Sequence, residues 1–196
     1  MSGLAREEIA DVAATVDGVP VPVAEVDVRE RVLRSSPQTA ALPRPGTSEG
    51  RQLRRWLTQL LVTERMIARE AEALGTHVTA QTPDERDLIP DLTARLEIGS
   101  IAASLLADPL ARAVYQRVTA DVDVDSGAVD GYRRRNPHRF AGEPDPTARI
   151  TEMLRGAARR RTFRIWLEQR RAALVWLAPG YEHPGDPRQP DNTHKH

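Results

Sequence analysis

The sequence predicts a mainly α-helical fold, in which an elongated helical domain carries a short N-terminal β element and a long C-terminal helix. Two long stretches, 48–74 and 147–177, are typical of helices, and only residues 13–23 suggest paired strands. Strands and helices do not alternate regularly along the chain, as an α/β fold would require. We therefore expect long helices packed around one elongated core.

The N-terminal stretch 13–23 (AATVDGVPVPV) predicts two short extended pieces around a turn. Asp17-Gly18 supplies that turn, because glycine adopts a positive φ at little cost. Pro20 and Pro22 cannot donate hydrogen bonds to a neighbouring strand, so the element should be an edge or a minimal hairpin.

A first helix is expected over about 24–33. Its first turn holds Glu25 and Asp27, which the helix dipole favours there. Residues 35–46 (SSPQTAALPRPG) are rich in proline and predict a loop before the next helix.

The strongest helix prediction covers 48–74, because its apolar residues share one face at helical spacing. Gly75 is a natural stop, and the polar residues 76–89 predict a loop. The apolar face consists of Leu53, Leu57, Leu60, Leu61, Ile67, Ala68, Ala71 and Leu74.

A second long helix is expected over about 91–118. Gly99 weakens it, and Pro109 should kink it or begin a new helix after Asp108. Residues 121–125 (DVDVD) alternate polar and apolar side chains and predict a short extended link. The apolar face of this helix consists of Ile98, Ile101, Ala102, Leu105, Leu106 and Ala113.

The remaining elements are a helix over about 126–136, a loop over 140–146 and the final helix over 147–177. We expect residues 13–177 to form a single helical domain. A short extension, 1–12, precedes this domain, and a Pro/His-rich tail, 178–196, follows it.

The composition excludes several classes of function. The 28 basic and 28 acidic residues balance, so no overall field favours nucleic acid or an anionic membrane as a partner. Without cysteine, the chain has no disulfide, thiolate metal site or cysteine nucleophile. We find no secretory h-region and no apolar run of membrane-spanning length, and we expect a cytoplasmic protein. The arginine-rich composition is typical of a GC-rich, actinobacterial genome.

Residues 46–50 (GTSEG) spell G-x-S-x-G and resemble the active-site motif of malonyl-CoA:acyl-carrier-protein transacylases. In a nucleophile elbow the serine follows a buried strand. The prolines within residues 42–45 rule out such a strand. We therefore interpret the string as a helix start, with Thr47 or Ser48 as the cap and Glu49 in the first turn, and the resemblance as spurious.

A wider resemblance rests on three other stretches. Residues 13–33 (AATVDGVPVPVAEVDVRERVL) resemble the opening of SurA-type chaperones and parvulin-type prolyl isomerases. Residues 124–140 (VDSGAVDGYRRRNPHRF) resemble the linker helix of that family. Residues 150–174 (ITEMLRGAARRRTFRIWLEQRRAAL) resemble its closing helix, which folds back on the N-terminal helices.

The resemblance implies a SurA N-terminal helical module whose parvulin domain is missing. Only the segment AGEPDPTAR lies between Phe140 and the final helix, where the family has its isomerase domain. Prolyl isomerase activity is therefore not implied.

Glu64 is the candidate acid or base. Helical spacing places this carboxylate among the apolar residues of 48–74, where desolvation would raise its pKa. Arg95 lies beside Ile98 and Ala102 on the next long helix. We expect Glu64 and Arg95 to pair, either as a structural ion pair or as a catalytic couple.

A candidate ligand groove is formed by aromatic and apolar residues. The alternative for these side chains is packing in the core. The groove set consists of Trp56, Leu60, Tyr115 and Trp166.

The arginines of the final helix, Arg159 among them, either grip phosphate groups or form solvated helix faces. Asp121, Asp123 and Asp125 imitate calcium-loop ligands, but Ser126 and Tyr132 stand where that loop needs glycine and glutamate. We predict no metal and no cofactor.

We expect a non-catalytic, SurA-like module that binds a peptide or protein client in an apolar groove. The alternative is a small biosynthetic enzyme or accessory protein that acts on carrier-bound, polyketide-type acyl intermediates. Expected partners are thus a client or a biosynthetic protein, or a second copy in a homodimer, and neither nucleic acid nor membrane.

Overall fold

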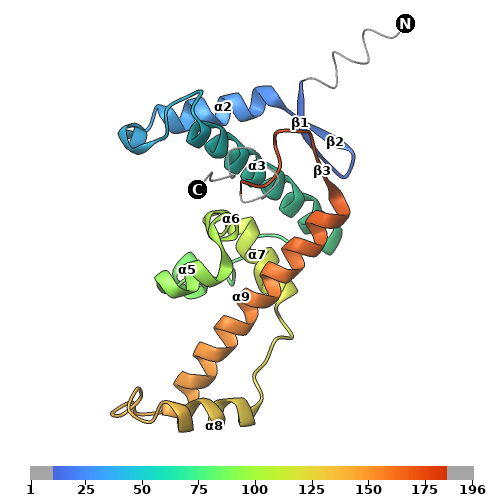
Figure 1. Ribbon diagram of the computed structural model, residues 1–196. Coiled ribbons are helices and arrows are strands. Elements are labelled where there is room, and N and C mark those ends of the chain that lie inside the picture. The colour runs from blue at the N-terminus through green and yellow to red at the C-terminus, as the bar shows by residue number, and fades with distance from the viewer. Residues whose placement is uncertain (1–10, 185–196) are drawn as a thin grey trace, which may run out of the picture. The chain divides into compact units, whose positions relative to one another are not determined.

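The computed structural model describes residues 11–184 and confirms the predicted mainly helical fold (Figure 1). A small three-stranded antiparallel sheet accompanies the helices, and the long helix near the C-terminus is present. The elements in chain order are β1 (Val12–Val16), β2 (Val19–Pro22), α2 (Val23–Arg34), the 3-10 helix η1 (Pro37–Ala41), α3 (Ser48–Leu74), α4 (Glu85–Leu88), α5 (Leu92–Ile98), α6 (Ser100–Leu105), α7 (Pro109–Val118), α8 (Ser126–Arg135), α9 (Pro146–Leu174) and β3 (Val175–Leu177).

The chain divides into two compact units, and we describe each by itself. The first unit contains the residues up to Arg69 and those from Arg170 onward. The second unit runs from Glu70 to Gln169. The boundaries fall inside α3 and α9. The expected single domain over 13–177 stays a prediction.

The sheet of the first unit has the order β2-β1-β3 (Figure 1). Asp17 (φ 50°) and Gly18 (φ 77°) make the predicted turn between β1 and β2, in the left-handed region that suits glycine and, among other residues, aspartate and asparagine. The strand β3 was not predicted, because we expected the last helix to reach Leu177. Its residues instead pair with β1, so the two ends of the described chain meet in one sheet.

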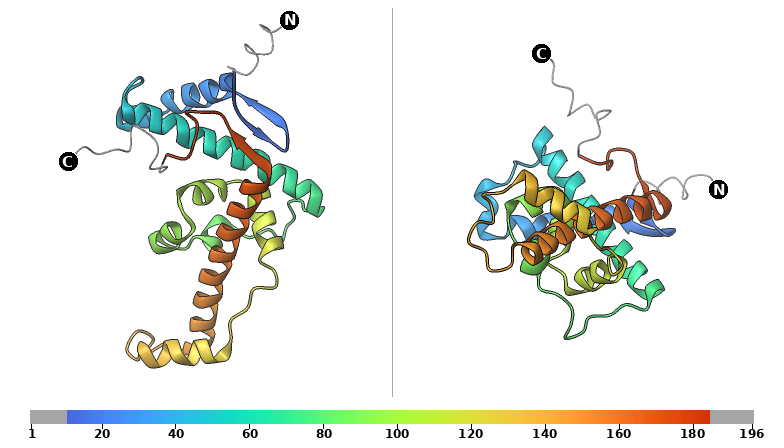
Figure 2. Two further views of the ribbon diagram at one scale, coloured as in Figure 1. Left: turned by 45° about the vertical axis from the view of Figure 1, so that its right-hand side comes forward. Right: turned by 90° about the horizontal axis from the view of Figure 1, so that it is seen from below.

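The core of the first unit lies between the sheet, α2 and α3. Two views show α2 running alongside α3 (Figure 2). Ala13 from β1, Val26 from α2 and Leu57 from α3 form its buried centre. The apolar side chains packed on this centre are Val23, Leu33, Leu53, Trp56, Leu61 and Tyr181.

The bounds of α3 are those that the sequence predicts. It begins at Ser48 and ends at Leu74, and Gly75 follows with φ 60°. Its predicted apolar face is largely buried, but Ala68 and Leu74 are exposed. The loop expected over 76–89 contains the short helix α4.

The second long helix, expected over 91–118, is three separate helices. Gly99 has φ 87° and separates α5 from α6, so it ends a helix rather than merely weakening one. Asp108 caps α7 by accepting a 2.8 Å hydrogen bond from Leu110 N, and Pro109 is the first helical residue. The core of the second unit is built from these helices and α9, with Ile98, Leu105, Leu106, Val114, Ile150 and Phe163 fully buried.

No helix in residues 11–184 is both long enough and apolar enough to cross a membrane.

Candidate functional site

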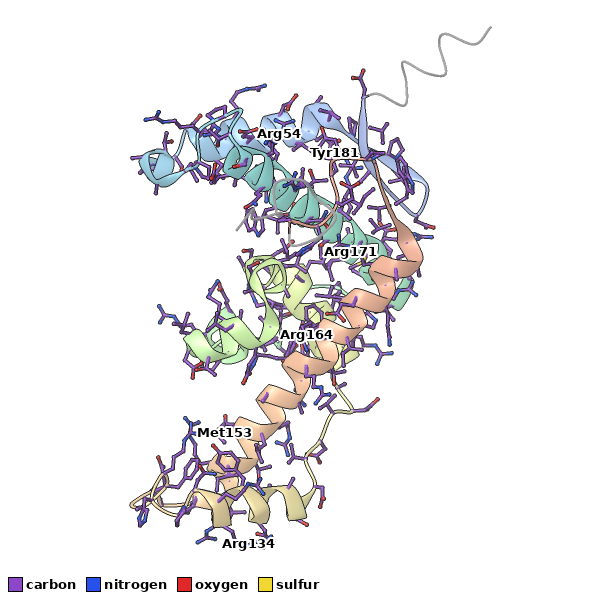
Figure 3. The ribbon with its side chains drawn as sticks, viewed as in Figure 1. Arg54, Arg134, Met153, Arg164, Arg171 and Tyr181 are labelled. Carbon is purple, nitrogen blue, oxygen red and sulfur yellow. The ribbon has the colours of Figure 1, made fainter. Side chains whose placement is uncertain are left out.

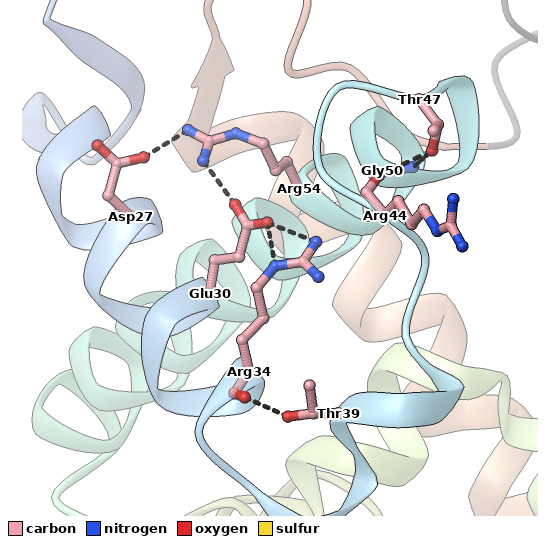
Figure 4. A network of polar contacts seen from close by, with 8 residues as sticks. All are labelled: Asp27, Glu30, Arg34, Thr39, Arg44, Thr47, Gly50 and Arg54. Atoms are coloured by element: carbon pink, nitrogen blue, oxygen red, sulfur yellow. Dashed lines mark hydrogen bonds and ion pairs between the residues drawn. The ribbon is translucent and has the colours of Figure 1, made fainter.

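The G-x-S-x-G string is a helix start, as predicted. Thr47 is the cap, because its Oγ1 accepts a 3.0 Å hydrogen bond from Gly50 N and donates one of 2.8 Å to Arg44 O (Figure 4). Ser48 is the first residue of α3, and the residues before it form η1 and a loop rather than a strand. The geometry of a nucleophile elbow is therefore absent.

Both glycines of the string have a conformational reason. Gly46 has φ 80°, which a larger residue would adopt only with strain. A Cβ on Gly50 would lie 2.3 Å from the carbonyl oxygen of Arg44. The two glycines thus fit a tight loop-to-helix connection, Gly46 through its positive φ and Gly50 through the close approach of the Arg44 backbone.

Ion pairs join α2 to α3 along the first unit. Arg54 on α3 contacts Asp27 at 2.6 Å and Glu30 at 2.7 Å, and Glu30 also accepts a 2.8 Å hydrogen bond from Arg34 (Figure 4). Arg65 of α3 likewise forms an ion pair with Glu25 of α2, at 2.5 Å. These arginines connect the two helices by charge as well as by apolar packing.

This network shifts the pKa values of Glu30 and Arg54. Burial alone would raise the pKa of Glu30, but the hydrogen bonds from Arg34 and Arg54 outweigh it and hold that pKa below its usual value. Burial alone would lower the pKa of Arg54. The hydrogen bonds to Asp27, Glu30 and Tyr181 outweigh this effect and hold the pKa of Arg54 above its usual value. Both groups remain charged at neutral pH.

Glu64, our candidate acid or base, belongs to the same set of ion pairs. Its carboxylate contacts Arg29 of α2 at 2.6 Å, and its side chain keeps 33% of its surface exposed. The expected Glu64–Arg95 pair stays a prediction, because the two residues belong to different units and each has a partner within its own unit. Arg95 is exposed and contacts Glu85 at 3.1 Å. Helical spacing indicated that Glu64 faces a neighbouring helix. It could not identify that helix as α2.

Within the first unit, the segment that follows β3 lies against α3 (Figure 3). Gln59 is fully buried in α3, and its Nε2 donates a 2.9 Å hydrogen bond to the backbone oxygen of Tyr181. The Oε1 atom of Gln59 accepts from Arg171. The start of the predicted tail, 178–184, thus docks through Tyr181, whereas residues 185–196 lie outside the described part of the chain.

The four predicted groove residues fall into two pairs, one in each unit. In the first unit, Trp56 is half-buried against the core and Leu60 is 6% exposed. In the second unit, Tyr115 and Trp166 both contact Phe163, with ring centroids 5.0 Å and 5.7 Å away. Within each unit these side chains therefore have packing partners of their own.

A cavity of about 340 Å³ opens in the second unit. Its wall is formed mainly by α7 and α9, with Asp87 and Leu88 from α4 and Pro83 just before that helix. Tyr115 and Gln116 face it from α7. The residues that α9 contributes are Glu152, Arg155, Gly156, Arg159 and Arg160.

Two of the three cavity arginines have carboxylate partners. Arg155 contacts Asp123 at 2.8 Å, and Arg160 contacts Glu97 at 2.8 Å with a further bond to Leu88 O. The hydrogen bond from Arg155 is one reason why the pKa of Asp123 lies below its usual value, after the bond from Val124 N. Among the described residues, Arg159 has neither a hydrogen bond nor an ion pair, although its Nε is buried. The sequence places Arg159 among the arginines of the final helix but gives no means of distinguishing it from the others.

The aspartates that imitate a calcium loop have other roles. Asp125 caps α8 by accepting a 2.8 Å hydrogen bond from Gly127 N, and Asp123 pairs with Arg155. Over residues 11–184, no group of three or more histidine, aspartate or glutamate side chains is arranged to hold a metal ion.

The second unit also exposes an apolar pair on α5. Leu92 and Leu96 are 69% and 73% exposed, whereas Ala94 and Ile98 on the opposite face are buried. Arg95 and Glu97 of the same helix form ion pairs with Glu85 and Arg160. A helix that is apolar on both faces has one face in need of a partner.

Comparison with known proteins gives one partial match. Residues 12–49 match the model of a family of unknown function (DUF7158). This match covers β1, β2, α2, η1 and the capped start of α3, so the short segment holds the turn and the cap described above. No curated protein and no solved structure matches the chain.

Proposed function

We propose that this protein is a non-catalytic module of SurA-like type that binds an apolar segment of another protein. The observation that carries the proposal is the exposed pair Leu92 and Leu96, one helical turn apart on α5. Burying an exposed leucine side chain contributes about 1.5–3 kcal/mol of favourable free energy. A partner that covers Leu92 and Leu96 therefore forms a complex that is stabilised by their burial.

The construction of α5 supports a binding role. Ala94 and Ile98 bury its inner face, and Glu97 pairs with Arg160, whose side chain is only 9% exposed. The leucines are thus presented on a fixed element, which reduces the entropy that binding would cost. A helical client segment with apolar residues at positions i and i+4, or an extended segment with alternating ones, fits such a ridge.

The ends of the described chain also support the SurA-like assignment. β3 follows α9 directly and pairs with β1, so that the end of the last helix returns to the N-terminal hairpin. The resemblance implies this return of the closing helix to the N-terminal elements.

The alternative, an enzyme or accessory protein for carrier-bound acyl intermediates, stays a prediction. Glu64, its proposed acid or base, is occupied by Arg29. The proposal of a client-binding module therefore rests on two exposed leucines, Leu92 and Leu96. The alternative rests on Glu64, whose carboxylate already pairs with Arg29.

Binding to a permanently unfolded protein tests the proposal. Fluorescently labelled, reduced and carboxymethylated α-lactalbumin serves as the probe, with anisotropy as the readout. We expect saturable binding to the wild-type chain. The double variant Leu92→Glu/Leu96→Glu should weaken it by about tenfold or more, since two charged side chains replace the apolar ridge.

The matched control is Val28→Glu/Val32→Glu. These valines form a second exposed apolar pair at i, i+4 spacing within one described helix, α2, with 50% and 64% exposure. Their replacement should leave binding unchanged. Equal losses in both double variants would indicate unspecific stickiness and contradict the proposal, as would no binding by the wild type. A dimeric mass in solution that Leu92→Glu/Leu96→Glu converts to a monomer would assign the ridge to a second copy instead.

A further inference from the structure

We propose that the cavity of the second unit binds a small organic carboxylate through Arg159. This site is independent of the client-binding ridge on α5. The inference starts from a guanidinium whose Nε is buried and has no partner among the described residues. A buried N–H group without an acceptor is costly, and native proteins normally satisfy such groups with protein, water or ligand.

The neighbouring charges leave Arg159 as the cation that is available to a ligand. Arg155 is occupied by Asp123, and Arg160 by Glu97. The charge of Arg159 reaches Asp123 through space, but the carboxylate of Asp123 is held by Arg155. A single free guanidinium matches a single negative charge, and its planar N–H groups match the two oxygens of a carboxylate.

Tyr115 supplies a second donor on the same wall. Its hydroxyl has no hydrogen-bond partner within residues 11–184, and its ring is packed on Phe163. Burial raises the pKa of Tyr115 to about 12, against the opposing effect of Arg160 and Arg159, so the hydroxyl keeps its proton at neutral pH. It can therefore donate to an anion beside Arg159.

The acids at the cavity select against highly charged ligands. Asp87 and Glu152 line it and are exposed. Glu152 contacts Arg149 at 3.3 Å, and Asp87 accepts a hydrogen bond from Asp84 N. The carboxylates of Asp87 and Glu152 would repel a phosphate dianion more strongly than a singly charged carboxylate.

The size and wall of the cavity define the rest of the ligand. About 340 Å³ is at the lower end of the range for small-molecule sites. Leu88 and Pro83 provide apolar surface. Gly156 keeps space open in the middle of α9, since a Cβ there would already lie 3.2 Å from Arg160 Nη1. An aliphatic or aromatic acid of modest size fits these limits.

Titration with phenylacetate tests the site. The side-chain Nε–H signals of arginine are observed by ¹H–¹⁵N NMR, and the Arg159 signal is assigned from its loss in Arg159→Gln. We expect a saturable shift of that signal with a dissociation constant below about 1 mM. Arg159→Gln should weaken phenylacetate binding, measured by calorimetry, by about tenfold, and Tyr115→Phe by a smaller factor.

Arg161→Gln is the matched control, because Arg161 is exposed on the same helix and does not line the cavity. It should bind phenylacetate as the wild type does. Phenyl phosphate should bind more weakly than phenylacetate at neutral pH. Tighter binding of phenyl phosphate would overturn the assignment to carboxylates, and a loss in Arg161→Gln equal to that in Arg159→Gln would overturn the site.

Thermal unfolding provides a second readout. Because Arg159 has no partner within residues 11–184, Arg159→Gln should not lower Tm, and phenylacetate should raise Tm only when Arg159 is present. A fall in Tm by several degrees without ligand would show that Arg159 is a structural group, and absence of saturable binding up to about 10 mM would also reject the site.

Discussion

The side-chain amide of Gln59 donates a 2.9 Å hydrogen bond to the backbone carbonyl of Tyr181, 122 positions further along the chain. Gln59 is fully buried, and its other amide atom accepts from Arg171. One side chain on α3 therefore fixes both the end of α9 and the segment that follows β3.

Replacement of Gln59 should destabilise the protein strongly. Gln59→Leu keeps the volume but leaves the Tyr181 carbonyl and the Arg171 guanidinium without their partner. We expect a loss of about 2–4 kcal/mol in the free energy of unfolding, measured by urea denaturation. Gln169→Ala, at an exposed position of α9, is the control and should change stability by less than about 0.5 kcal/mol. A neutral Gln59→Leu would show that the docked segment contributes little.

The helix start at residues 46–50 separates the roles of two neighbouring hydroxyls. Thr47→Ala removes the side chain that accepts from Gly50 N and should cost about 1 kcal/mol of stability. Ser48→Ala, one residue later, should cost less than about 0.5 kcal/mol and leave binding of unfolded α-lactalbumin intact. Chemical denaturation of both variants measures the difference. The reverse order, with Ser48 the more costly, would contradict the assignment of Thr47 as the cap.

Acid should remove part of the stability through Glu30. Its pKa lies below the ordinary value of 4.5 in the folded protein, so the unfolded chain binds more protons in the interval between the two values. The stabilisation is therefore fully present above about pH 4.5 and is lost as the pH falls through the folded-state pKa. Glu30→Gln should lower stability at pH 7 by about 1–2 kcal/mol.

The measurement for Glu30 is a pair of stability curves between pH 7 and pH 3. The curves of Glu30→Gln and wild type should converge at the acid end, because protonation removes the same charge. Parallel curves would mean that Glu30 does not titrate with folding.

The Arg29–Glu64 pair should contribute little stability. Both side chains are partly exposed, at 41% and 33%, so solvent screens their attraction. A double-mutant cycle with Arg29→Gln and Glu64→Gln should give a coupling energy of about 0.2–1 kcal/mol, reduced by high salt. A coupling well above this range would indicate that the pair is more buried than its exposure suggests.

The local elements were predictable where one stretch of sequence determines them. The bounds of α3 follow from a cap at Thr47, an apolar face and Gly75, all within the stretch itself. The turn at Asp17-Gly18 is equally local. The strand β3 was missed because its pairing with β1 joins residues about 160 positions apart, which no local pattern records.

The break at Gly99 was underestimated for a related reason. A glycine inside a helical pattern either weakens the helix or ends it, and only the surrounding packing decides between the two. In the structure Gly99 takes φ 87°, and α5 and α6 are separate.

Partners of charged residues were the least predictable part of the candidate site. Helical spacing showed that Glu64 shares a face with apolar residues, but Arg29 and Arg95 were equally available from the sequence. The same limit applies to Arg159. Among the described residues, Arg155 and Arg160 each pair with a carboxylate from elsewhere in the fold and Arg159 does not, which the sequence alone could not show.

Site-specific photo-cross-linking tests the central claim, that α5 presents a client-binding ridge, most directly. The variant Leu96→p-benzoylphenylalanine is irradiated with labelled, reduced and carboxymethylated α-lactalbumin, and Val32→p-benzoylphenylalanine on α2 serves as the matched position. We predict a covalent adduct at position 96 that exceeds the adduct at position 32 by about fivefold or more, as a contact at one site requires. Equal adducts at both positions, or none at position 96, would contradict the account.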